Sequence, residues 1–528
     1  MCKVLVSDYV SDAGIKLLEE HVEVYYNHKL SREEFLDIIG EYDGMIVRIF
    51  TQLDKEALDR AVKLKVIGRA GTGFDNIDLE EASKKGIIVF NTPTGNTISA
   101  AEHTMAMMLS LARNVPQANS AMHKGIWDRK RFNGVELKDK TLGIIGLGRI
   151  GSKVAKYAQA FGMKVVANDP YLPVEKAEIL NVPLISFDEL LERSDFITLH
   201  TPLTEETYHI LDKEAFEKMK DGVRIINVAR GKNLDSIALA EAIDMGKVAG
   251  AALDVHEEEP LPVDHPLLKF EDKVIVTCHL GGTTTEAMDN VSISAAEQVI
   301  AVLKEGKLPE SPLNIFSFEP EYVTKAKPYL ALIKKLSNFL AKWQGQERIK
   351  RIEIEYGGEI LDLNLKPLTT SVIKDILDPI LDDRVNLVNA YIVAKERGIK
   401  IKESRIEKPD GLSNFIRITL QTEKGVYTIA GTVLPIGTRV IEINNYRIDL
   451  NLEGKFLVAI YKDKPGVIGK LGTILGNEGV NIANMQVGRK AESGEAIMIV
   501  QTDSSPDSKT MDLLQIEKDF IEISYLEI

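Results

Sequence analysis

With 528 residues, of which 44% are apolar and 27% charged, the chain has the composition of an ordinary globular protein and a length that predicts about three or four domains. Its net charge of −14 and pI near 5.4 argue against nucleic acid and against an anionic membrane surface as partners. Only two cysteines are present and no run approaches ~18 apolar residues, so we expect no disulfide scaffold, no metal site, no membrane contact and a cytoplasmic location.

The N-terminal part alternates short apolar runs with helical patterns, which predicts a parallel α/β domain. Ligands of such sheets bind beyond the carboxyl ends of the strands, where Arg48 and the loop Arg69–Gly73 fall. The predicted strands are Lys3–Ser7, Gly44–Arg48 and Val66–Arg69, and the predicted helices are Ser11–Glu20 and Thr51–Ala61.

A long helix is predicted next, capped by Thr97 or Ser99 and running through Leu111. His103 lies among alanine, methionine and leucine in this helix, and we interpret it as a packed histidine whose ring nitrogens are satisfied. The segment Trp127–Phe132 then carries three cations and two aromatic residues, a composition typical of a solvated face.

The central motif is Gly146-Leu147-Gly148-Arg149-Ile150-Gly151, which follows an apolar run and opens a helical pattern. The first two glycines let the backbone approach a pyrophosphate, the third lets helix and strand pack, and the helix N-terminus supplies amide hydrogens. A second apolar run leads to Asp169, where a carboxylate binds ribose hydroxyls and repels a 2′-phosphate. The motif therefore predicts a Rossmann-type site that favours NAD over NADP.

Further apolar runs complete a doubly wound sheet, and several of them end on polar groups. The run Arg224–Val228 leads to Arg230, and the run Val248–Asp254 leads to the acidic turn His256–Pro260. The run Val274–Thr277 leads to His279. Successive strand ends would bring an arginine, an acid and a histidine to one cleft. The predicted strands are Phe196–His200, Arg224–Val228, Val248–Asp254 and Val274–Thr277.

These three kinds of side chain suit the oxidation of a 2-hydroxy acid. A neutral imidazole, His279, accepts the hydroxyl proton, because the ordinary pKa of histidine is about 6.5. A carboxylate on its other ring nitrogen stabilises the imidazolium, and Glu259 fits that role, with Glu257 and Glu258 as rivals that spacing alone does not separate. Arg230 grips the substrate carboxylate in a planar fork that lysine lacks.

The composition changes near Gly306, where prolines around Asn314–Glu319 indicate a linker. Beyond it we predict helices at Tyr329–Trp343 and Ser371–Lys395, and antiparallel strands at Phe415–Thr422, Val426–Val433 and Arg439–Leu450. The last block reads as βαββαβ, the ferredoxin-like plan, with strands at Lys455–Tyr461, Val480–Val487, Ala496–Thr502 and Ile521–Leu526 and a turn at Glu492–Glu495.

Five stretches resemble the D-isomer-specific 2-hydroxyacid dehydrogenases: Gly68–Gly73, Gly146–Gly151, Asn227–Gly231, Asp254–Pro260 and His279–Gly282. All four blocks together resemble the long, phosphoglycerate-oxidising branch of that family. The resemblance implies an α/β fold in which a Rossmann-type doubly wound parallel sheet is inserted in a second, flavodoxin-like α/β substrate domain. An α+β intervening domain and a ferredoxin-like βαββαβ ACT domain follow. The implied domains are substrate-binding (1–97 and 285–316), NAD-binding (98–284), intervening allosteric (317–451) and ACT (452–528).

The resemblance also implies site residues. It favours Glu259 as the acid of a catalytic triad with Arg230 and His279. One departure is visible, because relatives often have proline before the histidine, where this chain has Cys278. For the substrate it implies Arg48, Arg69, Thr72 and Asn96, with Arg129 reaching in from a neighbouring subunit. For NAD it implies Thr72, Gly146, Gly148, Arg149, Ile150, Gly151, Asp169, Thr201, Val228, Ala229, Arg230, Asp254, His279, Gly281 and Gly282.

The motifs around Asp463–Val467 and Gly479–Ala483 resemble the ACT motif, which implies L-serine as an effector held by Tyr461, Asp463 and Asn481. The expected reaction is oxidation of 3-phosphoglycerate by NAD, the first step of the phosphorylated serine pathway, in a homo-oligomer (dimer or tetramer) assembled through its Rossmann and ACT domains. Two alternatives remain at this stage. One is a dehydrogenase or reductase for another 2-hydroxy acid, such as 2-hydroxyglutarate or glyoxylate, and the other is an NAD-sensing, corepressor-like binding protein.

Overall fold

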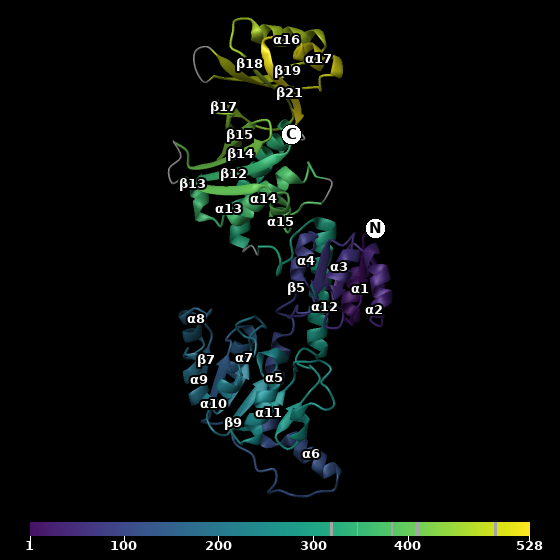
Figure 1. The fold of residues 1–528 in the computed structure, drawn as a ribbon, viewed down its shortest axis with the longest axis vertical. Coiled ribbons are helices and arrows are strands. Elements are labelled where there is room, and N and C mark those ends of the chain that lie inside the picture. Colours follow the sequence, from purple (N-terminus) through teal and green to yellow (C-terminus); the bar gives the residue numbers. More distant parts are fainter. Residues whose placement is uncertain (317–319, 346, 382–383, 407–410, 490–493) are drawn as a thin grey trace. The chain divides into compact units, whose positions relative to one another are not determined.

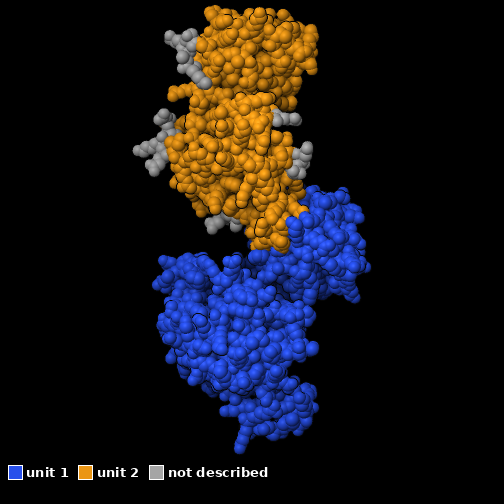
Figure 2. Space-filling view, viewed as in Figure 1, with its two compact units in different colours: residues 1–77, 89–311 blue, residues 78–88, 312–528 orange. Residues whose placement is uncertain are grey.

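The computed structural model describes residues 1–316, 320–345, 347–381, 384–406, 411–489 and 494–528 (Figure 1). The end of the predicted linker at 317–319, the predicted start of the intervening domain at 317 and residues 492–493 of the last predicted turn lie outside the described residues. Figure 2 shows two compact units, residues 1–77 with 89–311 and residues 78–88 with 312–528. In the described ranges, no helix combines the length and the apolar composition needed to cross a membrane.

The first sheet has five strands in the order β2-β1-β3-β4-β5, which is the order of the flavodoxin-like fold that the family resemblance implied. Strand β1 pairs in parallel with β2 and β3, and β3 with β4. Val4, Leu5 and Val6 are fully buried, as expected for a central parallel strand covered on both faces. The strands are β1 (Lys3–Val6), β2 (Glu23–Tyr26), β3 (Gly44–Val47), β4 (Val66–Arg69) and β5 (Ile88–Asn91).

A helix from much later in the chain returns to this first sheet. Helix α12 (Thr285–Glu305) packs against α1, β3 and β4, and Figure 1 shows it beside α1. The contact between α1 and α12 is close. A Cβ at Gly14 would lie only 2.7 Å from the Ser292 side chain, and the Ser11 N–H donates to Ser292 Oγ at 3.0 Å. The preceding helices are α1 (Asp12–Glu19), α2 (Arg32–Ile38), η1 (Ile39–Glu41), α3 (Lys55–Arg60) and α4 (Leu79–Lys84).

The second sheet has the order β11-β10-β9-β8-β6-β7, and every neighbouring pair is parallel. An isolated parallel bridge between Ala167 and Leu184 adds a very short strand outside β7. Counting that bridge, the order becomes that of a dinucleotide-binding sheet, as predicted. The strands are β6 (Thr141–Ile145), β7 (Lys164–Asn168), β8 (Phe196–Leu199), β9 (Val223–Asn227), β10 (Val248–Leu253) and β11 (Val274–Val276).

Helix α5 starts differently from the prediction. Its N-cap is Asn96, whose side chain does not cap the helix, so the predicted caps Thr97 and Ser99 are wrong. Thr97 already lies in the first turn, where its hydroxyl donates to the Pro93 carbonyl. The helices here are α5 (Thr97–Arg113), α6 (Val115–His123), α7 (Arg149–Ala160), α8 (Val174–Ile179), α9 (Phe187–Arg193), α10 (Lys213–Lys218), η2 (Gly231–Asn233), α11 (Ser236–Asp244) and η3 (Pro266–Lys269).

The third sheet, in the order β13-β12-β14-β15-β16-β17, is mixed, because β12 and β13 are parallel and the other pairs antiparallel. The predicted strand Arg439–Leu450 is instead a hairpin, since Asn444 and Asn445 both adopt positive φ, as a tight turn requires. The strands are β12 (Ile349–Gly358), β13 (Lys400–Ile406), β14 (Asn414–Thr422), β15 (Val426–Leu434), β16 (Gly437–Ile443) and β17 (Tyr446–Leu450).

The single helix predicted at Ser371–Lys395 is also wrong. The segment forms two helices, because Pro379 has no N–H to continue the hydrogen-bond ladder beyond Leu377. The helices of this part are α13 (Pro320–Trp343), η4 (Glu359–Asp362), α14 (Lys366–Leu377) and α15 (Ala390–Glu396).

The last sheet is antiparallel with the order β19-β20-β18-β21, which confirms the ferredoxin-like prediction. Both faces of this sheet are covered. Leu457 and Met498 pack with Leu471 of helix α16, whereas Phe456 and Ile497 join the hydrophobic core of the preceding sheet. The elements are β18 (Lys455–Lys462), α16 (Val467–Asn477), β19 (Ile482–Arg489), β20 (Glu495–Thr502), α17 (Ser508–Gln515) and β21 (Phe520–Glu527).

Candidate active site

The glycine motif lies between the end of β6 and the start of α7, whose N-cap is Gly148. Gly146 adopts a positive φ of 91°, and a Cβ at Gly151 would lie 2.2 Å from the Gly146 carbonyl oxygen, so the third glycine is required for packing. A Cβ at Gly148 would meet no atom within 4 Å, which leaves open space above the helix N-terminus. An anionic pyrophosphate fits this place.

Asp169 follows β7, and its carboxylate is held at the mouth of this motif. It accepts hydrogen bonds from the backbone N–H groups of Leu147 at 2.9 Å, Tyr171 at 3.0 Å and Leu172 at 3.1 Å. Thr201 follows β8 and lies next to Gly146, since a Cβ at Gly146 would be 3.0 Å from Thr201 Cγ2. Its hydroxyl is buried and has no partner among the described residues, so a bound dinucleotide would satisfy it. These features fit NAD.

His279 and Glu259 are brought together by two different loops, with 2.8 Å between His279 Nδ1 and Glu259 Oε2. Glu259 also accepts a hydrogen bond from the His256 backbone N–H at 3.0 Å. Burial raises the pKa of Glu259, but its hydrogen bonds with His279 and His256 outweigh that effect and hold the pKa below its ordinary value. The ionised acid thus keeps the proton on Nδ1 and leaves Nε2 able to accept one.

The rival acids lie differently. Glu257 Oε2 lies 2.8 Å from His209 Nε2, and its other oxygen accepts from the Ser236 backbone N–H at 2.9 Å, so its carboxylate is already bound by a separate loop and by the start of α11. Glu258 is exposed. Of the three glutamates, the geometry favours Glu259 beside His279.

Asp254 anchors the turn that carries His279. Its carboxylate accepts from the backbone N–H groups of Leu280 and Gly281, each at 2.8 Å, and from Thr277 Oγ1 at 2.5 Å. His103 Nε2 lies 3.1 Å from the same group. Burial raises the pKa of Asp254, yet these hydrogen bonds bring it to about 2. His103 Nε2 therefore has a partner, in line with the interpretation of this histidine, but the sequence did not indicate that this partner is Asp254.

Three arginines gather beyond the strand ends. Arg48 follows β3, Arg69 ends β4 and Arg230 follows β9. Arg69 is 8% exposed, and its pKa falls to about 9 because of burial and of repulsion from Arg230 and Arg48. The Nε atoms of Arg48 and Arg69 are buried and have no partner among the described residues. A bound anion would relieve both conditions.

Several of the remaining predicted residues lie against one another, in loops and at the start of α7. Thr72 Oγ1 donates to Asn96 Oδ1 at 2.7 Å, and a Cβ at Gly282 would lie 3.1 Å from Asn96 Nδ2. Val228 contacts the position of Gly281. Arg149 and Ile150 open helix α7, and Ala229 precedes Arg230. Arg129 instead lies in the exposed segment between α6 and β6.

The predicted effector residues lie at the ends of strands in the last sheet. Tyr461 is 1% exposed and its hydroxyl has no partner among the described residues. Burial and the nearby Asp463 raise the pKa of Tyr461. Asp463 forms an ion pair with Arg489 at 3.0 Å, and Asn481 Nδ2 donates to Asp503 at 2.6 Å. The Asp463 and Asn481 side chains are therefore held by contacts within the same chain, whereas the Tyr461 hydroxyl has no such contact in the described ranges.

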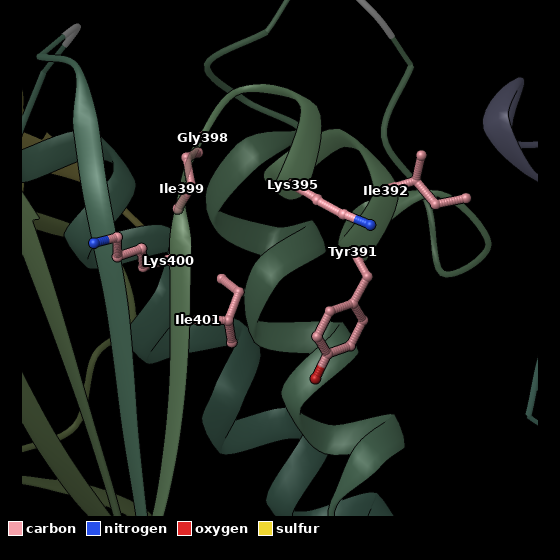
Figure 3. Close-up of a pocket in the computed structure, with 7 residues that line it drawn as sticks. All are labelled: Tyr391, Ile392, Lys395, Gly398, Ile399, Lys400 and Ile401. Carbon is pink, nitrogen blue, oxygen red and sulfur yellow. The ribbon is translucent and has the colours of Figure 1, made fainter.

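A pocket of about 480 Å³ lies between α15 and β13 in the second unit (Figure 3). It is lined by Tyr391 and Lys395 of α15, shown as sticks in Figure 3, and by residues 398–401. None of the residues predicted as functional from the sequence lines it.

A dinucleotide-type sheet with an arginine and a histidine–glutamate pair beyond the ends of its strands fits an NAD-dependent dehydrogenase. Residues 105–281 match the family model "D-isomer specific 2-hydroxyacid dehydrogenase, NAD binding domain". Residues 325–444 match the D-3-phosphoglycerate dehydrogenase intervening domain and residues 456–518 match the ACT domain.

Relatives extend this similarity along the whole chain. D-3-phosphoglycerate dehydrogenase of Methanocaldococcus jannaschii is 44% identical over 95% of both chains, and that of Bacillus subtilis is 41% identical over 100% of both. The chain belongs to the D-3-phosphoglycerate dehydrogenase family. Among solved structures, D-lactate dehydrogenase from Aquifex aeolicus, complexed with NAD and lactic acid, is 33% identical, with a TM-score of 0.51 over 57% of this chain and 96% of that chain. A glyoxylate reductase from Paecilomyes thermophila is 30% identical, with a TM-score of 0.54 over 61% and 98%.

Proposed function

We propose that this chain oxidises 3-phospho-D-glycerate to 3-phosphohydroxypyruvate with NAD, the first step of the phosphorylated serine pathway, and that L-serine inhibits it through the ACT domain. The observation that supports this substrate most strongly is the group of three arginines. Two of them have buried Nε atoms without a partner among the described residues. A substrate with both a carboxylate and a phosphate matches this charge.

Each residue of the cleft has a role in this proposal. Arg230 binds the carboxylate and the C2 oxygen through its planar fork, and Arg48 and Arg69 bind the phosphate. His279 Nε2 accepts the proton of the C2 hydroxyl while Glu259 holds its Nδ1–H and stabilises the imidazolium. The motif from Gly146 to Gly151 would hold NAD, which would supply the hydride acceptor for C2 when bound. The other predicted cofactor and substrate residues keep the roles stated above as proposals.

The direct test is product analysis. Incubation of the full chain with NAD and 3-phospho-D-glycerate, followed by mass spectrometry, is expected to show 3-phosphohydroxypyruvate and an equal amount of NADH. Absence of both products under conditions where NAD binds would refute the proposed reaction.

Asp169 is proposed to select NAD. Asp169→Ala removes the charge that repels a 2′-phosphate, so the ratio of kcat/KM for NAD to that for NADP should fall at least about tenfold. Asp188→Asn, which removes an exposed acid from the first turn of α9, is the matched control and should leave the ratio unchanged. An unaltered ratio in Asp169→Ala would place the selectivity elsewhere.

We propose that L-serine binds at Tyr461, Asp463 and Asn481, where the buried Tyr461 hydroxyl supplies an unsatisfied group. Asp463→Asn removes the negative charge for the effector ammonium, so the serine concentration for half-inhibition should rise at least about tenfold while uninhibited turnover stays normal. Asp512→Asn, on the exposed face of α17, is the control. Unchanged serine sensitivity in Asp463→Asn would move the effector site elsewhere.

The proposed assembly follows the same reasoning. We propose a homo-oligomer in which Arg129 approaches a neighbouring subunit. The exposure of Arg129 supports this, as does Trp127, which lies two residues earlier and is 78% exposed.

The domain boundaries at 97/98, 284/285, 316/317 and 451/452 are proposed too. The family matches over three separate ranges and the packing of α12 on α1 support them.

A further inference from the structure

We propose that Asp75 is a positioning residue for Arg230, and that its carboxylate holds the guanidinium in the orientation that receives the carboxylate of the substrate. This inference rests on the proposed role of Arg230 in the cleft. Asp75 belongs to the loop after β4 in the first sheet, and Arg230 follows β9 in the second sheet. The arginine is therefore oriented by a residue of the other sheet.

The contact is short and directional. Arg230 Nε donates to Asp75 Oδ2 at 2.8 Å, and Arg230 Nη1 donates to the Ala229 carbonyl at 2.7 Å. A guanidinium has five N–H groups in one plane, and these two bonds fix that plane. The other three N–H groups make no hydrogen bond among the described residues, and a bidentate carboxylate contact needs two of them.

The backbone next to Asp75 is shaped around the arginine. A Cβ at Gly73 would lie 1.8 Å from Arg230 Nη2, so only glycine leaves room for the guanidinium there. A Cβ at Gly71 would likewise lie 1.8 Å from Arg69 Nη1. The loop 71–75 thus accommodates two guanidinium groups and supplies a carboxylate to one of them.

The negative charge of Asp75 also opposes the repulsion among the three arginines. Arg48, Arg69 and Arg230 repel one another, and the repulsion contributes to the lowered pKa of Arg69. Asp75 and Asp8 act in the opposite direction on that pKa. The side chain of Asp75 is half exposed and that of Arg230 is 26% exposed, so the pair stays accessible to a substrate.

Asp75 has two proposed effects, on the orientation of Arg230 and on the charge around it, and these two effects change kcat and KM differently. Loss of orientation lowers kcat, because a misplaced binding group can cost about 100-fold in rate. Loss of a negative charge among three cations does not weaken the binding of an anionic substrate, so KM should not rise in parallel. Asp75→Ala is therefore expected to lower kcat about 100-fold with KM unchanged or lower. Asp75→Asn, which keeps an oxygen acceptor for Arg230 Nε, should recover most of the lost turnover.

A double-mutant cycle with Arg230→Ala tests whether Asp75 acts through Arg230. In the Arg230→Ala background, followed at high enzyme concentration, Asp75→Ala should lower kcat less than twofold further. NAD affinity and thermal unfolding are measured for every variant, and both should match the parent in the two Asp75 variants. Asp78→Asn, three residues along, removes only the acid that caps α4 and serves as the control.

Two results would overturn the proposal. One is an equal loss of kcat from Asp75→Ala in the presence and absence of the Arg230 side chain, and the other is a normal kcat in Asp75→Ala. The cycle uses whichever 2-hydroxy acid the unmodified chain oxidises fastest. A failure of 3-phosphoglycerate as substrate would therefore refute the proposed function without deciding the role of Asp75.

Discussion

Replacement of His279 by alanine is expected to lower kcat by on the order of 10⁴-fold, because the proposed mechanism transfers the proton of the C2 hydroxyl to this imidazole as hydride leaves. The imidazole is oriented by Glu259 at 2.8 Å, and its turn is anchored by Asp254. The side chain is 31% exposed and fills no core position, so the fold should be retained. NAD affinity, followed by fluorescence titration, should stay within about twofold of the parent, because the glycine motif and Asp169 are untouched.

The matched control for this change is His21→Ala, since His21 is an exposed histidine that follows α1. It should have normal turnover. Near-normal turnover in His279→Ala would show that the proton goes to another acceptor, and the proposed mechanism would be wrong.

Arg230→Lys should be nearly as damaging although it keeps the positive charge. Lysine has a compact ammonium and cannot make two parallel hydrogen bonds to a carboxylate, nor can it keep the bond that Arg230 Nε makes with Asp75. We expect a loss in kcat of about 10²- to 10³-fold, the range seen when one donor to a developing charge is removed. Steady-state kinetics with a fixed, saturating NAD concentration measures it.

Arg113→Lys, at the exposed end of α5, is the control for the same chemical change and should be neutral. An unchanged kcat in Arg230→Lys would mean that charge alone is sufficient at this position. The planar fork would then have no role in the reaction.

The glycine motif and the strand ends were predictable because their physical requirements are local. Gly146 needs a positive φ and Gly151 needs close packing, and both requirements concern neighbours within six residues. The strand ends that carry Arg230 and His279 follow from short apolar runs, which identify buried parallel strands well. The alternation of the last block likewise predicted its sheet order.

Pairings between distant residues were not predictable in this way. His103 and Asp254 are 151 residues apart, and Arg230 and Asp75 are 155 apart, so no sequence period connects them. The role of Glu257 was open for the same reason, since its partner His209 comes from a separate loop. Only the fold shows which carboxylate faces which cation or imidazole.

The wrongly predicted elements depend on local features that the pattern of apolar residues does not show. The hairpin at Asn444 and Asn445 was read as one strand, because alternation continues through a tight turn. The helix predicted at Ser371–Lys395 ignored Pro379, which ends α14. Strand β12 pairs in parallel with β13, although the helices α14 and α15 lie between these two strands in the chain. The helical periodicity of that segment does not predict the pairing of the strands that flank it.

The measurement that tests the account most directly is NADH formation by the full chain with 3-phospho-D-glycerate and with D-glycerate, each with and without L-serine. Arg48 and Arg69 predict a kcat/KM at least about 100-fold higher for the phosphorylated acid, because charged hydrogen bonds to the phosphate each contribute about 1.5–3 kcal/mol. Serine should suppress that rate. Similar rates with both acids, unaffected by serine, would contradict the account and leave a general 2-hydroxy acid dehydrogenase.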